Sequence, residues 1–317
     1  MNILVTGGLG IVGSGLVKEL RNRGHHVISC DIVHQPDEVG FSLRTDIKTP
    51  LYARCDVGEF RQIERVFDKL GPFDYVYHCA AEFGRWNGED FYELLWRTNV
   101  VGTKNIIRLQ EKLKFRLIHF SSSEVYGDWP ELMIESVMDE YEIKQMNDYA
   151  MTKWVNEMQI LNSADKFGTE TVRVRLFNTY GPGEYYSEYR SALCLFIYSA
   201  LHDLPYVVYT KHTRTSSYVD DTVRTLANIA ERFKPGEVYN IAGKDLHTMK
   251  QASDIILNYL GKDDSLVEYR DTQEATTLDK KVDNSKAVRE LGHKSTISLE
   301  EGIARTIEWQ KEVYHRG

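Results

Sequence analysis

The sequence predicts an α/β fold, in which a doubly wound parallel sheet is joined by a smaller C-terminal lobe. Two patterns predict this fold. Short β-branched runs alternate with longer amphipathic stretches through the first half of the chain, and a glycine-rich turn directly follows the first run. The 317 residues are 42% hydrophobic and 27% charged, which is typical of a globular chain with a large core.

Seven short runs are predicted as strands because β-branched and aromatic residues concentrate in them. These strands are 2–6, 26–31, 51–55, 75–79, 116–121, 171–175 and 237–241. Elsewhere, apolar residues recur every three or four positions, as in helices that cover a sheet. These helices are 11–23, 60–70, 91–113, 148–167, 249–260 and 299–314. The order of the elements therefore predicts repeated βαβ units.

A glycine-rich turn links the first predicted strand to the first predicted helix. It reads TGGLGIVG over residues 6–13 and contains the spacing G-x-G-x-x-G. Glycine permits the tight turn and lets the backbone approach a pyrophosphate at the helix N-terminus. Asp31 ends the second strand, where a carboxylate accepts hydrogen bonds from ribose hydroxyls and repels a 2′-phosphate. The sequence therefore predicts a Rossmann-type site for NAD rather than NADP.

The candidate cofactor residues come from this turn and from the ends of the next strands. Asp56 and Val57 follow the third strand and are candidates to face the adenine, although an Asp at a strand end is often only a helix cap. The residues assigned on these grounds are Gly7, Gly10, Ile11, Val12, Gly13, Asp31, Asp56 and Val57.

A candidate acid–base group combines one helix with the end of one strand. Tyr149 and Lys153 stand four residues apart and share a helix face, and the fifth strand leads into Ser122, Ser123 and Glu124. A phenol has a pKa of about 10, so it acts as a base near neutral pH only where positive charge favours the phenolate. We expect Lys153 and an oxidised nicotinamide to supply that charge. Tyr149 would then remove a hydroxyl proton while Ser122 holds the same oxygen.

These motifs, in this order, resemble an extended short-chain dehydrogenase/reductase of the nucleotide-sugar epimerase/dehydratase family, over nearly the whole chain. The segments that carry the resemblance are 6–13, Asp31, 56–57, 78–81, 99–105, Ser122, Tyr149 with Lys153, 175–182 and 214–221. The resemblance implies that Cys79, Ala80 and Ala81 lie along the cofactor and that Asn99 steadies the active-site helix. It further implies that Lys153 holds the nicotinamide ribose and that Tyr149 belongs to the same cofactor site.

The chain is predicted to divide into two lobes without a flexible linker. The NAD-binding domain comprises residues 1–177 and 214–242, and the nucleotide-sugar-binding lobe comprises 178–213 and 243–317. The segments of the second lobe lack the βαβ rhythm. We expect them to lie over the carboxyl ends of the strands, where ligands bind in such folds.

The resemblance also implies residues for a nucleotide-diphosphate sugar. Asn178 and Arg214 match positions that contact the diphosphate, and a guanidinium fork donates two parallel hydrogen bonds to such a group. Arg270 is a weaker candidate for the nucleotide end. The stretch 183–190 lies where the family shapes its sugar pocket, which makes Glu184 and Arg190 candidate sugar contacts.

The family's shared chemistry begins with hydride transfer from sugar C4 to NAD. The 4,6-dehydratases carry an Asp-Glu pair where this chain has Ser123 and Glu124, so dehydration is disfavoured. The Ser-Glu pair resembles UDP-glucuronate decarboxylases, but the sequence identifies no spare cation for a substrate carboxylate. We therefore rank a net 4-dehydrogenase or 4-epimerase above a decarboxylase. Glu124 is a base at C5 or a ligand of a sugar hydroxyl, and both roles stay open.

Charge and hydropathy argue against other classes of protein. The 39 Lys and Arg against 47 Asp and Glu give a net charge of −8, and no basic run suits nucleic acid. No apolar stretch is long enough for a membrane span, and the chain opens without a leader pattern, so we expect a cytoplasmic protein. The four cysteines lack CxxC spacing and the histidines lack ligand spacing, which predicts no metal site.

Two expectations concern catalysis and assembly. A dinucleotide sensor without activity is the alternative from another class, and it is disfavoured because Tyr149, Lys153 and Ser122 are all present. The resemblance implies a homodimer in which helices 91–113 and 148–167 of each subunit pair.

Overall fold

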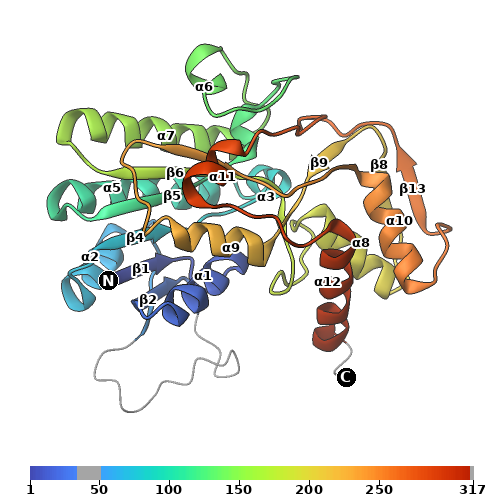
Figure 1. The fold of residues 1–317 in the computed structure, drawn as a ribbon, viewed down its shortest axis with the longest axis horizontal. Helices are drawn as coiled ribbons and strands as arrows, with labels where there is room; N and C mark the ends of the chain where they lie inside the picture. The colour runs from blue at the N-terminus through green and yellow to red at the C-terminus, as the bar shows by residue number, and fades with distance from the viewer. Residues whose placement is uncertain (34–50, 315–317) are drawn as a thin grey trace.

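A seven-stranded parallel sheet forms the centre of the computed structural model, which describes residues 1–33 and 51–314 (Figure 1). Its strand order is β11-β6-β5-β4-β1-β2-β3, and the order reverses beside β1, where ligands bind in doubly wound sheets. The predicted fold class is confirmed. The strands are β1 (Asn2–Thr6), β2 (His26–Asp31), β3 (Tyr52–Arg54), β4 (Tyr75–His78), β5 (Arg116–Ser122), β6 (Thr171–Leu176) and β11 (Val238–Ile241).

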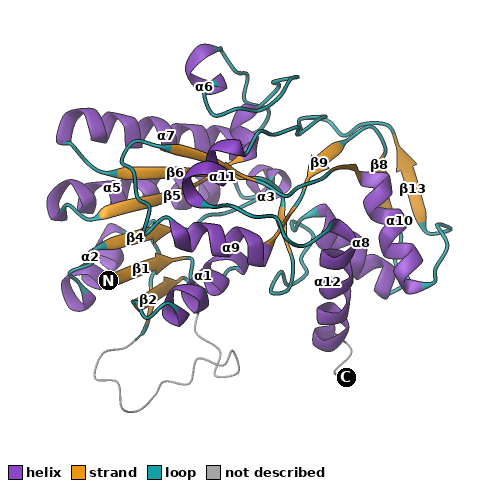
Figure 2. Cartoon of the chain, in the orientation of Figure 1, coloured by secondary structure: helices purple, strands orange, loops and turns teal. Residues whose placement is uncertain are grey.

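Helices cover both faces of the sheet (Figure 2). Successive side chains of a strand point to opposite faces, so Ile3 and Val5 pack in one core and Leu4 packs in the other. The first core is covered by α1 (Ile11–Asn22), α9 (Val219–Asn228) and α11 (Ser285–Leu291). The second is covered by α2 (Phe60–Leu70), α5 (Gly102–Leu113) and α7 (Asp148–Phe167).

The predicted helix 91–113 is interrupted. It consists of α4 (Tyr92–Trp96), a π-helical turn at Arg97–Val101 and α5, and it follows α3 (Arg85–Asp90), which was not predicted. Inside the π turn, Asn99 is buried, and its Nδ2 donates to Thr152 Oγ1 of α7 at 3.0 Å. The π turn therefore lies where Asn99 contacts α7, the helix that carries Tyr149.

The second lobe has a core of its own, on the right in Figure 1. It is built from α8 (Ala192–Leu201), β8 (Tyr206–Tyr209), α10 (Met249–Leu260), β13 (Val267–Arg270) and α12 (Leu299–Tyr314). Short strand pairs link the lobes: β7 (Thr179–Tyr180) with β10 (Ser217–Tyr218), and β9 (Thr213–Thr215) with β12 (Leu246–Thr248). Two short helical turns, Ser123–Tyr126 and α6 (Val137–Glu140), follow β5.

One segment departs from the predicted lobe boundary. Helix α11 falls inside the range 243–317 that was assigned to the sugar-binding lobe, but its Ala287 and Leu291 are buried in the core that also holds Tyr239 and Ile241 of β11. The chain thus returns to the sheet before it forms α12. None of the helices described is long and apolar enough to cross a bilayer.

A buried ion cluster joins α7 to β5 and β6. Glu157 is fully buried, and its Oε2 accepts hydrogen bonds from Arg173 at 3.1 Å and Arg175 at 2.9 Å. Its Oε1 accepts a bond of 2.6 Å from Ser121. Burial by itself raises the pKa of Glu157, but Arg175, Arg173 and Ser121 bring the pKa below its usual value. The carboxylate therefore stays charged and ties the helix to both strands.

We expect Glu157→Gln to lower the free energy of unfolding by about 3–5 kcal/mol, because two buried guanidinium groups lose their counter-charge. Urea unfolding followed by fluorescence and circular dichroism measures the change. The depressed folded-state pKa means that Glu157 stabilises the protein above its unfolded pKa of about 4.3, and that this stabilisation is lost as pH falls through the folded pKa. The difference between variant and native protein should therefore shrink at acid pH.

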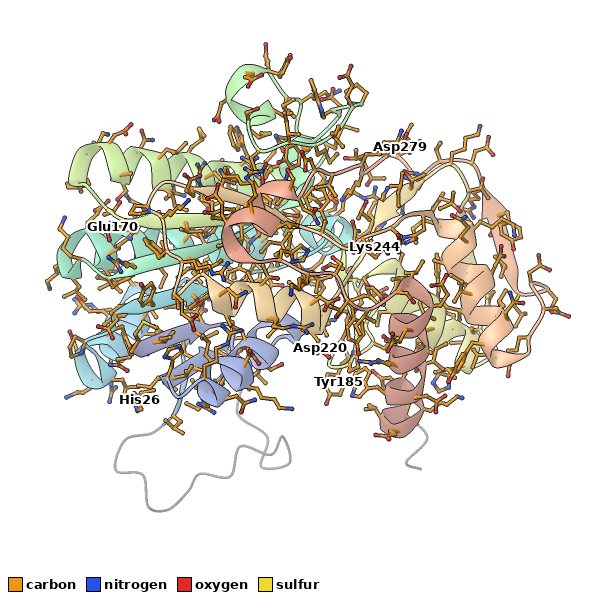
Figure 3. The ribbon with its side chains drawn as sticks, viewed as in Figure 1. His26, Glu170, Tyr185, Asp220, Lys244 and Asp279 are labelled. Atoms are coloured by element: carbon orange, nitrogen blue, oxygen red, sulfur yellow. The ribbon has the colours of Figure 1, made fainter. Side chains whose placement is uncertain are left out.

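The matched control is Glu170→Gln. Glu170 forms an exposed ion pair with Arg116 at 2.9 Å, at the far left of the view in Figure 3. Loss of an exposed pair costs about 1 kcal/mol at most. Equal destabilisation by the two variants would contradict the role given to the buried cluster.

Candidate functional site

The turn after β1 packs against the end of β4. Gly7 has a φ of 68°, and a Cβ on it would lie 2.7 Å from the backbone nitrogen of Ala80. A Cβ on Gly13 would lie 2.0 Å from the carbonyl oxygen of Gly7. Both positions therefore require glycine, one for conformation and close approach and the other for close approach alone. The result is a turn with bare backbone at the edge of the sheet, as a dinucleotide site needs.

Asp31 lies against the same turn. Its Oδ2 accepts a hydrogen bond of 3.0 Å from the backbone N–H of Leu9. The predicted ribose carboxylate and the predicted pyrophosphate turn are thus in direct contact. Asp56 is engaged differently, because it pairs with Arg97 and accepts a bond of 2.8 Å from Gly58 N–H. Val57 is buried beside Gly102, where a Cβ would lie 2.8 Å from the Val57 Cγ2 atom.

The residues of this edge fit NAD. The glycine turn offers backbone N–H groups at the start of α1, and Asp31 stands at the neighbouring strand end. Cys79, Ala80 and Ala81 follow β4 and are half-buried. The residues that would hold the dinucleotide at this edge are Gly7, Gly10, Ile11, Val12 and Gly13 with Asp31 and the segment 79–81.

Tyr149 and Lys153 project from the first turns of α7, which is capped by Asn147 through a bond of 2.9 Å from Ala150 N–H to its Oδ1. Burial raises the pKa of Tyr149 to about 12, and hydrogen bonding with Ser122 opposes the rise. Burial lowers the pKa of Lys153 to about 8. Its Nζ donates to the carbonyl oxygen of Phe120 at 2.9 Å and lies 5.8 Å from the Tyr149 ring centre.

This geometry differs from one expectation. Lys153 was expected to favour the phenolate of Tyr149. Instead, the field of Glu124 adds to burial in raising the pKa of Tyr149, and the contact within the chain that lowers it is the one with Ser122. Tyr149 is therefore a neutral phenol near neutral pH in the chain by itself. Ser122 ends β5 next to it and also accepts a bond of 3.2 Å from Glu124 N–H.

Lys280 is a site residue that the sequence analysis missed. Its side chain is 2% exposed, its Nζ ion-pairs with Glu124, and the same nitrogen donates to Ser123 Oγ at 3.2 Å. Burial opposes ionisation of Glu124, but Lys280, followed by Arg214 and Asn147, brings its pKa below the usual value. No local motif marks Lys280, because it stands beside Lys281 in a polar stretch and reaches Glu124 only through the fold.

Lys280 is delivered by residues 273–283, a segment that we call the strap. The strap is held by His212, whose Nε2 accepts from Gln273 N–H at 2.9 Å, and by Arg214, whose Nη1 donates to the carbonyl of Leu278 at 2.9 Å. Asp279, labelled in Figure 3, marks its course above β9. Arg214, a predicted diphosphate ligand, thus also positions the strap.

The other predicted substrate residues lie in varied surroundings. Asn178 has a φ of 41°, and its buried Oδ1 finds no hydrogen-bond partner among the residues described. Glu184 closes its own loop, since its carboxylate accepts from Ser191 N–H at 3.0 Å and from Ser191 Oγ at 2.8 Å. Arg190 lies 4.2 Å above the ring of Phe83. Arg270 is on the surface of β13, paired with Glu268 at 2.7 Å.

Gly7→Ala tests the close approach of the turn to β4. We expect it to weaken NAD binding strongly, because the added Cβ would collide with the Ala80 backbone and displace the turn. The control is Gly24→Ala, since Gly24 has a comparable φ of 81° but no atom within 4 Å of an added Cβ. Strain at positive φ alone costs about 1 kcal/mol. Calorimetric titration with NAD measures both variants, and equal affinities would argue against a dinucleotide at this turn.

Comparison with known proteins agrees with this geometry. Residues 3–242 match the NAD dependent epimerase/dehydratase family. The dTDP-glucose 4,6-dehydratase of Salmonella typhimurium is 27% identical, over 98% of this chain and 92% of its own. The UDP-N-acetyl-alpha-D-glucosaminuronate decarboxylase of Bacillus cytotoxicus is 29% identical, with 98% of each chain covered. The UDP-glucose 4-epimerase of Thermotoga maritima, solved with UDP-glucose, has a TM-score of 0.85 at 25% identity, with 99% of both chains covered. The chain therefore belongs to the NAD dependent epimerase/dehydratase family and is an NAD-dependent enzyme of the extended short-chain dehydrogenase/reductase type.

Proposed function

We propose that the protein oxidises C4 of a nucleotide-diphosphate sugar to a 4-keto sugar, as a net 4-dehydrogenase or a 4-epimerase. The observation that carries this proposal is the convergence of Tyr149, Lys153 and Ser122 at the sheet edge that also bears the glycine turn. NAD, when bound, supplies the hydride acceptor. The residues of the chain hold the alcohol and move its proton.

Tyr149 is the group that removes the C4 hydroxyl proton. Hydrogen bonding with Ser122 lowers the pKa of the Tyr149 phenol, whereas burial raises it. Lys153 is fixed by the carbonyl of Phe120, which holds its ammonium near the ring. In the proposed complex, the hydroxyls of Tyr149 and Ser122 and the ammonium of Lys153 surround the C4 oxygen of the sugar. Because the protein fixes their positions, the sugar alcohol is oriented for hydride transfer.

Dehydration is the outcome that the site supports least. Protonation of a leaving hydroxyl needs a carboxylic acid, but Ser123 has no carboxyl group and Glu124 is ion-paired with Lys280. The lowered pKa of Glu124 means that it remains a carboxylate near neutral pH. Glu124 is thus able to accept a proton or a hydroxyl hydrogen bond, and unable to donate one.

Decarboxylation is the second candidate, and Lys280 favours it. A decarboxylase needs positive charge at the end of the site that receives the substrate carboxylate, and the buried ammonium of Lys280, although paired with Glu124, adds positive charge there beside Ser123. In a 4-keto hexuronic acid, the bond between C5 and C6 breaks, C6 leaves as CO2, and the electron pair moves to the C4 oxygen. Tyr149 and Ser122 would then donate hydrogen bonds to that oxygen.

Two further assignments belong to the proposal. Asn178 and Arg214 hold the diphosphate, with Arg270 at the nucleotide end, and the loop of Glu184 and Arg190 borders the sugar. The protein forms a homodimer through α4, α5 and α7. Support for the homodimer comes from apolar side chains that are exposed on these helices: Leu94, Leu113, Met151 and Phe167.

Tyr149→Phe tests the main proposal with UDP- and dTDP-sugars as probes. We expect turnover to fall by about 10²- to 10⁴-fold, the contribution of a positioned acid–base group, while NAD binding is kept. NADH absorbance and product mass are the measurements. Loss of two hydrogens indicates dehydrogenation, unchanged mass indicates epimerisation, and loss of CO2 indicates decarboxylation. Loss of water, or full activity of the variant, would contradict the proposal. Tyr259→Phe, an exposed change on α10, is the control.

Lys280→Met separates the two candidate outcomes. For a decarboxylase we expect CO2 release to slow by about 10- to 100-fold, which corresponds to the loss of one charge-assisted contact. Oxidation of C4 should slow less, because Tyr149 and Ser122 are unchanged. The control is Lys281→Met, the exposed neighbour. If both lysine variants behave alike, or if no CO2 is released by the native enzyme, the decarboxylase candidate fails.

A further inference from the structure

Arg85 lies at the border of the site, at the start of α3. Gly88 stands one turn further along α3, and a Cβ on Gly88 would lie 3.7 Å from the backbone nitrogen of Tyr149. Residues three apart share a helix face, so the face of α3 that bears Arg85 packs on the first turn of α7. The backbone of α3 is therefore close to the helix turn that carries Tyr149, and the Arg85 side chain extends from it to the strap.

The guanidinium of Arg85 has carbonyl and aromatic neighbours, and it forms no ion pair with any residue that the structure describes. It donates through Nη1 to the carbonyl of Glu274 in the strap and lies 4.2 Å above the ring of Trp86. Its Nε is buried and finds no hydrogen-bond partner among the residues described. The carboxylate that acts on it most strongly is Glu124, which is already ion-paired with Lys280.

Three cations therefore face one carboxylate. Lys280 is neutralised by Glu124, whereas Arg214 gives its Nη1 to the carbonyls of Thr213 and Leu278 and has Asp279 nearby. Arg85 forms no ion pair among the residues described, and the two carboxylates that act on it are Glu124, which is already paired with Lys280, and Glu89 of its own helix. A partly buried guanidinium without an ion pair is stabilised when an anion binds to it.

We propose that Arg85 binds a carboxylate at C6 of the sugar, so that the substrate is a nucleotide-diphosphate hexuronic acid. The inference rests on the proposed oxidation at C4. Glu124 lies in the turn that starts at Ser122, so a cation that faces Glu124 borders the sugar whose C4 oxygen Ser122 would hold, and C6 is two bonds from C4. The planar fork of a guanidinium matches a carboxylate with two parallel hydrogen bonds. The diphosphate has separate candidates in Asn178 and Arg214, on other elements.

UDP-glucose and UDP-glucuronic acid are the probes, because they differ only at C6. Calorimetric titration of the NAD-loaded enzyme measures both, and the pair is repeated with thymidine as the base. We expect the acid to bind about 10- to 100-fold more tightly in the native protein, which corresponds to a charge-assisted contact. Arg85→Gln should remove this preference and leave the affinity for UDP-glucose unchanged. Arg85→Lys should keep part of it, because the charge remains without the fork.

The control is Arg108→Gln. Arg108 is an exposed arginine of α5 that also lies over an aromatic ring, 3.9 Å above Phe60 of α2. Equal affinity of the native enzyme for the two sugars overturns the inference. An equal loss for both sugars in Arg85→Gln also overturns it, because it would assign Arg85 to the diphosphate or to folding. The titration is repeated in the Tyr149→Phe background, where turnover is not expected, and oxidation at C4 is followed separately with the native enzyme. A preference for the acid with no oxidation at C4 would reject the proposed function and leave the inference on Arg85 standing.

Discussion

The contact between α7 and the end of β5 is the constraint on which the site depends. Lys153 and Glu157 are one turn apart on α7 and bind consecutive residues of the strand, through the Phe120 carbonyl at 2.9 Å and the Ser121 hydroxyl at 2.6 Å. Because both hydrogen bonds come from one face of α7, they fix the rotation of the helix about its axis and its position along the strand. Tyr149, one turn before Lys153, is thereby placed beside the residue that follows Ser121 in the strand.

The protonation states at the site follow from where charge is buried. Tyr149 is held neutral by burial, with a pKa of about 12, whereas Glu124 is held ionised by Lys280 despite its burial. The pKa values of the two groups are thus shifted in opposite directions, which suits the proposed reaction: Tyr149 exchanges a proton with the sugar alcohol, and Glu124 stays an anion. The carboxylate of Glu124 is close to cations of α3, β9 and the strap, namely Arg85, Arg214 and Lys280.

The parts predicted from sequence are those that local patterns encode. The bounds of β1, β2, α2 and α7 follow from periodicity, and the glycine turn and Tyr149 with Lys153 are motifs within single βαβ units. Lys280 and Arg85 were not predicted, because their partners are distant in sequence or are main-chain carbonyls that no side-chain pattern marks. The π turn at Arg97–Val101 was missed because an apolar helical period continues through it.

Local motifs carry the residues for oxidation at C4, whereas the residues that would decide the final product are brought together only by the fold. The proposed oxidation at C4 uses Tyr149, Lys153 and Ser122, which one strand and one helix supply. The proposed events at C5 and C6 involve groups brought to Glu124 from α3 and the strap, and the strap is positioned by long-range backbone hydrogen bonds such as that between Lys280 N–H and the Thr213 carbonyl at 3.2 Å. A substitution at Lys280 in the strap is therefore expected to change the product more than the proposed chemistry at C4, because Lys280 contacts Glu124 and Ser123, whereas the α7–β5 contact is made by Lys153 and Glu157.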